Sequence, residues 1–142
     1  MPSDDDSRDE AAAEPVPGRV TVLVVDDSKT IRRSAAGFLS RAGWTVETAS
    51  DGFEALAKVV EHRPDIVFAD IMMPRLDGYQ TCALIKNNAD FRHTPVVMLS
   101  SRDGLFDRAR GRVVGSDAHL SKPFTEETLV GAVRDLVAGA GA

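Results

Sequence analysis

Five polar side chains in this 142-residue chain stand where apolar runs end. They are Asp26, Asp27, Asp70, Ser100 and Lys122. Carboxylates suit Mg²⁺, which prefers oxygen ligands and usually takes one or two carboxylates together with phosphate oxygens. A hydroxyl and an ammonium group can contact the oxygens of a phosphoryl group. The set therefore predicts a site for a divalent cation and a phosphoryl group.

The three acids are expected to have different roles. Asp26 and Asp27 are adjacent, and their carboxylates repel each other unless a cation lies between them. Asp70 is the candidate nucleophile, because a carboxylate beside a divalent ion can attack a phosphoryl group. The segment 71–78 suits a rigid loop that presents a backbone carbonyl to the metal, and Met72 is the expected donor by its position.

The elements that must position these residues alternate along the chain. Apolar, β-rich runs predict strands at residues 20–25, 44–48, 65–69, 96–99 and 118–121. Helical periodicity predicts helices from the N-cap Ser28 to Gly43, at 52–62, at 79–87, at 103–114, and after the N-cap Thr125.

The periodicity also predicts which residues of these helices face the core. In the helix at 52–62 they are Phe53, Leu56, Val59 and Val60. In the helix at 103–114 they are Leu105, Phe106, Ala109 and Val113.

Alternation of strands and helices predicts an α/β fold, with helices on both faces of a parallel sheet. Five strands fit a single doubly wound domain of (βα)5 form with the flavodoxin-like strand order 2-1-3-4-5. In such sheets ligands bind at the carboxyl ends of the strands, where all five polar residues are expected to meet.

Composition sets the domain limits and excludes several partners. Residues 20–138 form one predicted domain, preceded by an acidic tail at 1–19 that we expect to be disordered, and followed by a frayed end at 139–142. The net charge of -5 argues against a general affinity for nucleic acid or for an anionic membrane surface. No apolar run approaches the roughly 18–20 residues needed to span a bilayer, so membrane insertion is not expected. The single cysteine, Cys82, cannot form an intrachain disulfide, so a cytoplasmic location is predicted.

These motifs resemble a known family. Asp26-Asp27-Ser28, the segment 70–78, Ser100 and Lys122-Pro123-Phe124 are similar to the receiver domain of two-component response regulators, which has a CheY-like fold. The resemblance covers residues 20–137.

The resemblance implies that Asp70 accepts a phosphoryl group from a histidine kinase, of the CheA-like type. It also implies that Asp26, Asp27, Asp70 and the Met72 carbonyl hold Mg²⁺. Ser100 and Lys122 would contact the phosphoryl group, and the Lys122–Pro123 peptide would be cis. Such a domain is a signalling module and not an enzyme, since it catalyses only its own phosphorylation and dephosphorylation.

A narrower resemblance concerns surfaces that partners contact. Residues 75–88 and 99–107 are similar to stand-alone receivers of type IV pilus, or twitching-motility, chemosensory systems. The resemblance implies that the fourth helix, fifth strand and fifth helix bind a downstream protein. Four arginines give this region a basic character, at positions Arg102, Arg108, Arg110 and Arg112, and they form either a solvated face or a surface that selects an acidic partner groove.

One residue departs from the family pattern. Receivers often carry Tyr or Phe three residues before the lysine, and this chain carries His119. An imidazole can pack as such a ring does, and it can also titrate near neutral pH. An ordinary switch, a surface residue and a pH-sensitive switch therefore all stay open.

Other functions are compatible with parts of this pattern. A phosphate sink, a receiver of another chemotaxis-like pathway and a plain interaction domain all fit the fold. A magnesium-dependent aspartyl phosphohydrolase of the haloacid dehalogenase class fits less well, because it needs an acid two residues beyond the nucleophile. That position is Met72.

Overall fold

The structure, a computed structural model, describes residues 19–101, 109–110 and 112–140. Its strands are β1 (Thr21–Val25), β2 (Thr45–Ala49), β3 (Ile66–Asp70), β4 (Val96–Ser100) and β5 (Ala118–Ser121). The helices with complete bounds are α1 (Lys29–Arg41), α2 (Gly52–His62), α3 (Gly78–Lys86) and α5 (Glu126–Leu136).

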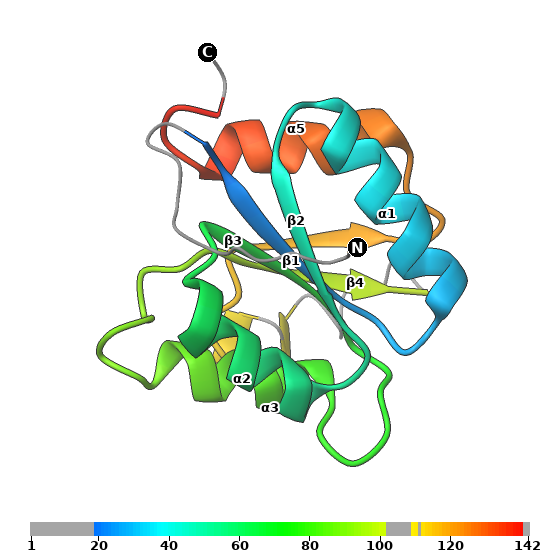
Figure 1. Ribbon diagram of the computed structural model, residues 1–142. Coiled ribbons are helices and arrows are strands. Elements are labelled where there is room, and N and C mark those ends of the chain that lie inside the picture. The colour runs from blue at the N-terminus through cyan, green and yellow to red at the C-terminus, as the bar shows by residue number, and fades with distance from the viewer. Residues whose placement is uncertain (1–18, 102–108, 111, 141–142) are drawn as a thin grey trace.

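The strands form one parallel sheet in the order β2-β1-β3-β4-β5, which confirms the predicted topology. Helices α1 and α5 cover one face of the sheet, and α2 and α3 cover the other (Figure 1). The carboxyl ends of all five strands therefore lie along one edge.

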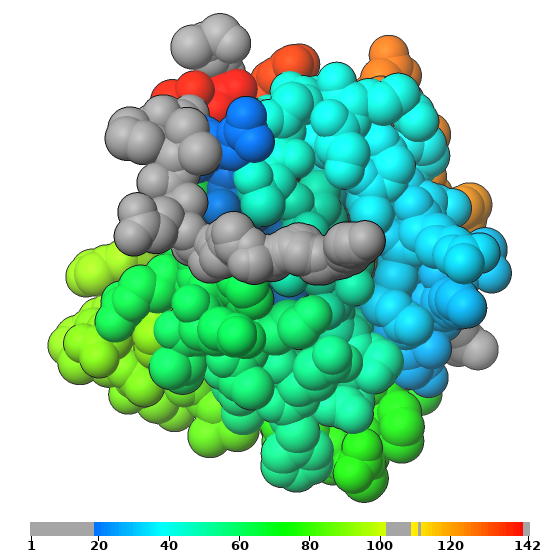
Figure 2. Space-filling view, viewed as in Figure 1, coloured from blue at the N-terminus to red at the C-terminus, as the bar shows by residue number. Residues whose placement is uncertain are grey.

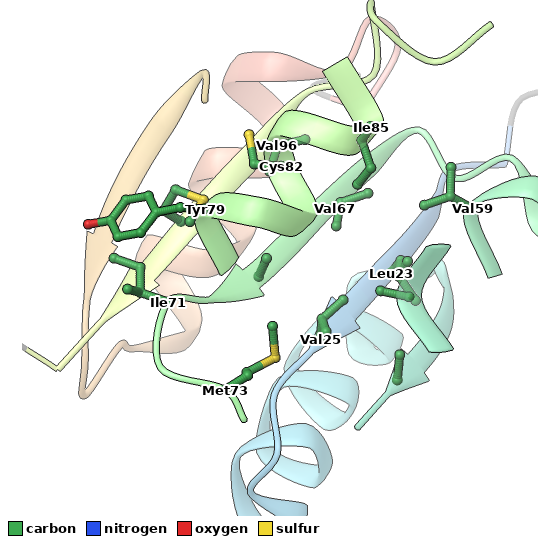
Figure 3. Close-up of a cluster of buried hydrophobic side chains, with 14 of the residues drawn as sticks. Leu23, Val25, Val59, Val67, Ile71, Met73, Tyr79, Cys82, Ile85 and Val96 are labelled. Atoms are coloured by element: carbon green, nitrogen blue, oxygen red, sulfur yellow. The ribbon is translucent and has the colours of Figure 1, made fainter. Parts of the chain in front are cut away.

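Continuous burial explains why three strands have unbroken apolar sequences. Strands β3 and β4 are buried along their whole length, and β1 is buried at four of its five positions. Strands covered on both faces need apolar residues at consecutive positions. Alternate residues of each strand then point to opposite faces of the sheet, so the protein has two cores. Figure 3 shows the core beneath α2 and α3, in which Leu23 and Val67 of the sheet belong to the same buried cluster as Cys82 and Ile85 of α3.

Side-chain caps fix the starts of the helices. The predicted N-caps are confirmed, since Ser28 Oγ accepts from Ile31 N at 3.3 Å and Thr125 Oγ1 accepts from Thr128 N at 3.1 Å. Each cap satisfies a backbone N–H that has no partner inside the helix.

The predicted inward face of α2 was wrong at two positions. Phe53 is 55% exposed and Val60 is 62% exposed, whereas Gly52, Ala55 and Val59 are buried. The apolar arc of this helix is wider than the strip that the sheet covers, so periodicity alone placed its outer edge in the core.

The helix predicted at 103–114 lies mostly outside the described residues. Residues 109–110 and 112–113 are helical, as predicted, but both Ala109 and Val113 are exposed, so their assignment to the core was wrong. Leu105 and Phe106 lie outside the described residues.

Past the last helix, Ala140 is buried against the core that α1 and α5 cover.

Within the described residues, the structure has no helix with the length and apolar character that crossing a bilayer requires.

Candidate functional site

The fold brings all five predicted residues to the carboxyl edge of the sheet. Asp26 and Asp27 directly follow β1, and Asp70 is the last residue of β3. Ser100 is the last residue of β4, and Lys122 directly follows β5. Strands β4 and β5 end side by side at this edge, because Ser100 pairs with Ser121.

Three acids converge at this edge. One oxygen each from Asp26, Asp27 and Asp70 can be chosen so that all lie within 4.8 Å of one another. Asp26 is fully buried and Asp70 is 4% exposed, while Asp27 is open to solvent. Two oxygens that share one Mg²⁺ are at most about 4.2 Å apart, and the spacing of these three oxygens is close to that limit. The donor set therefore fits a hard divalent cation.

Lys122 joins two of the acids. Its Nζ lies 2.8 Å from Asp26 Oδ2 and 3.1 Å from Asp70 Oδ1. The lysine side chain is 18% exposed, so these ion pairs are largely shielded from water. The Lys122–Pro123 peptide is cis, which confirms that expectation. The ammonium group thus holds the acids together from one side of the site.

The pKa of Asp70 and the pKa of Lys122 are both raised, for different reasons. The pKa of Asp70 is raised, chiefly because burial disfavours its charged form and secondly because Asp26 repels it; Lys122 offsets part of this effect. For Lys122, burial acts to lower the pKa, but its hydrogen bonds with Asp26 and Asp70 outweigh burial and raise it. Lys122 therefore stays charged at neutral pH, and a second cation would favour ionised Asp70.

Backbone contacts hold Asp26 in place. Its Oδ1 accepts a hydrogen bond from Ser28 N at 2.9 Å. Its carbonyl oxygen accepts one from Arg32 Nη1 at 2.7 Å. Arg32 was not predicted as a site residue, although its place one turn into the helix that follows the acid pair is a signal for this contact.

The loop after Asp70 is fixed at both of its ends. Met72 N lies 3.4 Å from Asp70 Oδ1, and the Met72 side chain is 72% exposed. At the far end, Gly78 N donates to Ile71 O at 3.0 Å. A Cβ on Gly78 would collide with the backbone carbonyl of Asp70, so this close approach requires glycine. Gly78 was not predicted as a positioning residue either.

Arg75 links this loop to α2. Its φ of 67° is in the left-handed region, which is unusual for a residue with a side chain. Its Nη2 lies 3.1 Å from Asp51 Oδ2, and its guanidinium group lies 5.5 Å from the centre of the Phe53 ring. These two contacts hold the loop against the start of α2.

The two predicted switch residues lie on adjacent strands. Ser100 is 4% exposed, and its carbonyl oxygen accepts from Lys122 N at 2.6 Å. His119 pairs with Met98 across the β4–β5 ladder and is half-buried. Its Nε2 is buried, and within the described residues no atom forms a hydrogen bond with it.

Part of the predicted basic surface is described. Arg110 and Arg112 are exposed, whereas Arg102 and Arg108 lie outside the described residues. The guanidinium group of Arg110 lies 4.6 Å from the centre of the Tyr79 ring. Arg110 and Tyr79 both line an open pocket of about 480 Å³ beside the loop that follows Asp70.

Comparison with known proteins identifies the class. Residues 22–134 match the response regulator receiver domain, and the chain belongs to that family. It is therefore a signalling domain of the two-component type, and such domains bind Mg²⁺ in an acidic pocket like the one described above. They interact with histidine kinases and with downstream targets.

Individual relatives narrow the comparison. The chain is 65% identical to Protein PilG of Pseudomonas aeruginosa over 113 residues, which cover 80% of this chain and 84% of PilG. It is 42% identical to response regulator MprA of Mycobacterium ulcerans over 118 residues, but these span 83% of this chain and only half of MprA. Among solved structures, chemotaxis response regulator CheY4 of Vibrio cholerae is 35% identical with a TM-score of 0.81, and the match covers 84% of this chain and 99% of CheY4.

Proposed function

We propose that the chain is a stand-alone response regulator that accepts a phosphoryl group on Asp70 from a CheA-like histidine kinase. The observation that supports this most strongly is the position of Asp70, which is buried between Lys122 and two further acids at the carboxyl edge of the sheet. A nucleophile, a cation site and a fixed positive charge are all within reach of one phosphoryl group.

Asp26, Asp27, Asp70 and the Met72 carbonyl would hold Mg²⁺. When bound, the ion neutralises charge on the incoming phosphoryl oxygens. Asp26 and Asp70 are already held in place by Lys122 and by backbone N–H groups, so little rearrangement is needed.

The transfer step uses side chains that are already in position. An Asp70 carboxylate oxygen attacks the phosphorus atom of the kinase phosphohistidine, and an O–P bond forms. The P–N bond breaks, and its electron pair returns to the kinase imidazole. Lys122 Nζ exchanges its contact with Asp70 for one with a phosphoryl oxygen and keeps its contact with Asp26. The Ser100 hydroxyl donates to another phosphoryl oxygen.

The response is a shift between two states of the protein. Contacts of the phosphoryl group with Ser100 and Lys122 favour the active state. His119 lies on β5, three residues before Lys122, and pairs with Met98 of β4, so its ring is close to the strands that carry both contacts. A downstream protein would bind the active state at the surface formed by the fourth helix, β5 and α5, where Arg110 and Arg112 favour an acidic partner.

A type IV pilus chemosensory pathway is the proposed setting. The 65% identity to PilG supports it, together with the resemblance of residues 75–88 and 99–107 to pilus-type receivers. A cytoplasmic location follows from coupling to such a kinase, and the buried thiol of Cys82 agrees with a reducing compartment. The exposed Met72 at the position of a second acid argues against a phosphohydrolase.

Phosphotransfer from a radiolabelled CheA-like kinase tests the proposal. We expect label on the wild type and none on Asp70→Asn. Beryllofluoride-treated protein should then capture pilus regulators from a lysate that Asp70→Asn does not capture. Phosphotransfer without any activated-state partner would favour a phosphate sink, and hydrolysis of phosphomonoesters would favour an enzyme.

A further inference from the structure

Helix α2 presents an apolar stripe to solvent. Phe53, Ala57 and Val60 are spaced by four and three residues, so they lie on one face of the helix. Phe53 is 55% exposed, Val60 is 62% exposed, and Ala57 is also exposed. In Figure 2 the side chains of α2 form part of the surface turned towards the viewer, in green below the centre. This stripe is the side of α2 that faces away from the sheet.

Helix α3 extends the stripe. Its Leu84 is 49% exposed. A Cβ on Gly52 of α2 would touch Thr81, so Thr81 lies on the side of α3 next to α2. Leu84 follows Thr81 by three residues and lies on the neighbouring part of that side. Phe53, Ala57, Val60 and Leu84 together are called the α2–α3 surface.

Acidic side chains border this surface on the flank away from α3. The Arg75 guanidinium group lies 5.5 Å from the centre of the Phe53 ring, but it is paired with Asp51 at 3.1 Å, so this pair adds no net charge. Gly52 and Glu54 lie on opposite sides of Phe53, each about 100° around the helix. Because Gly52 faces α3, Glu54 lies on the flank away from α3, and Glu61 lies seven residues further along the same flank. The Glu61 side chain is 69% exposed, and its contact within the described residues is with the neighbouring His62 ring at 3.4 Å. Lys58 is 3.9 Å from Glu54 and offsets part of that charge.

We propose that the α2–α3 surface is a docking site for an amphipathic helix of a partner protein that carries Lys or Arg along one edge of its apolar face. The apolar stripe supplies the contact area, as in other helix-in-groove complexes. The acidic flank sets the orientation and selects basic over acidic helices. This site lies on a different surface from the fourth helix, β5 and α5, so it goes beyond the proposed phosphoryl function.

Charge also decides against a second copy of this chain. If two α2 helices packed antiparallel about a two-fold axis, the flank with Glu54 and Glu61 would face the same flank of the copy. Four carboxylates would then meet along one edge, and like charges at close range destabilise an interface. The net charge of -5 adds to this repulsion.

The test uses two designed peptides with the full chain. One is a helical peptide of about 18 residues with leucines at i, i+3, i+4 and i+7 positions and lysines along one edge. The other carries glutamates in place of the lysines. We expect the basic peptide to bind at least about tenfold more tightly at low salt in fluorescence anisotropy, with the ratio falling as salt is added.

Matched variants locate the binding. Val60→Asn should weaken the basic peptide about tenfold. Val113→Asn makes the same change at an even more exposed valine, 85% exposed, and should change the affinity less than about twofold. Glu61→Gln should weaken binding about two- to threefold and reduce its salt dependence. All three variants should keep phosphorylation of Asp70, which separates this proposal from the proposed function.

The proposal is overturned if the basic peptide does not bind at about millimolar concentration, if both peptides bind equally, or if both valine variants lose affinity alike. It is also overturned if light scattering shows a dimer that Val60→Asn dissociates, because the surface would then serve self-association.

Discussion

Replacing Lys122 by methionine removes the ammonium group that contacts two buried acids. The methionine stem occupies a similar volume, so the change is mainly one of charge. Asp26 is fully buried and the Asp70 side chain is 6% exposed, and both lose an ion pair, at 2.8 Å and 3.1 Å respectively. The repulsion between the two carboxylates is then no longer offset from that side.

Removing one partner from a buried ion pair costs about 3–5 kcal/mol. The 18% exposure of the Lys122 side chain places the loss near the lower end, at about 3 kcal/mol of unfolding free energy. For a domain of this size the melting temperature should fall by about 10 °C. Magnesium should recover part of the loss, because a divalent ion replaces the missing positive charge.

Urea denaturation of wild type and Lys122→Met, with and without Mg²⁺, measures both quantities. An ion at ten times its dissociation constant stabilises a protein by about 1.4 kcal/mol. The variant should gain more than the wild type, since Lys122 no longer competes for Asp26 and Asp70.

Lys86→Met is the matched control. The Lys86 side chain is 14% exposed and its Nζ lies 2.7 Å from Asp117 Oδ2, next to the amino ends of the strands. This variant should also lose stability, but magnesium should not restore it. The reasoning is refuted if Lys122→Met stays within about 1 kcal/mol of the wild type without magnesium, or if magnesium stabilises both lysine variants equally.

Three further changes test other parts of the site. Because the pKa of Asp70 is raised above 3.8, this residue stabilises the fold at low pH and loses that contribution as pH rises through its folded pKa. Without metal and near neutral pH, Asp70→Asn should therefore unfold at a higher urea concentration than the wild type, and this difference in urea concentration should be smaller in acid. A variant less stable than the wild type at neutral pH would count against the raised pKa of Asp70. Gly78→Ala should lose about 2 kcal/mol or more and impair phosphorylation, whereas Gly131→Ala, with open space around the added methyl group, should be neutral or stabilising. Burial raises the pKa of the Cys82 thiol to about 11, so iodoacetamide at mildly alkaline pH should label it only in denaturant; rapid labelling of native protein would contradict its burial.

Local signals in the sequence predicted most of the fold. The bounds of α2 agree with the predicted range, because Arg63 and Pro64 interrupt the helix pattern. Ser28 and Thr125 were predicted as N-caps from their residue types and from the apolar periodicity that follows them. The strand ends followed from apolar runs, and parallel topology then placed Asp70 and Lys122 at the same edge.

Pairwise contacts could not be predicted in this way. The sequence placed an ammonium group near three acids, but it could not show that Lys122 pairs with Asp26 and Asp70. The contacts of Arg75 with Asp51 and Phe53 also depend on a left-handed backbone conformation that no local pattern signals. The exposure of Phe53 was missed because periodicity gives the direction of an apolar face and not the width that the sheet covers.

Phosphorylation of Asp70 by acetyl phosphate can be measured on the intact protein by mass spectrometry, with peptide mapping of the modified residue. We expect one phosphoryl group, on Asp70, formed only when Mg²⁺ is present, and lost in both Asp70→Asn and Asp26→Asn. Phosphorylation that proceeds equally well in a chelator, or that maps to another residue, would contradict a magnesium-assisted aspartyl acceptor at this edge of the sheet.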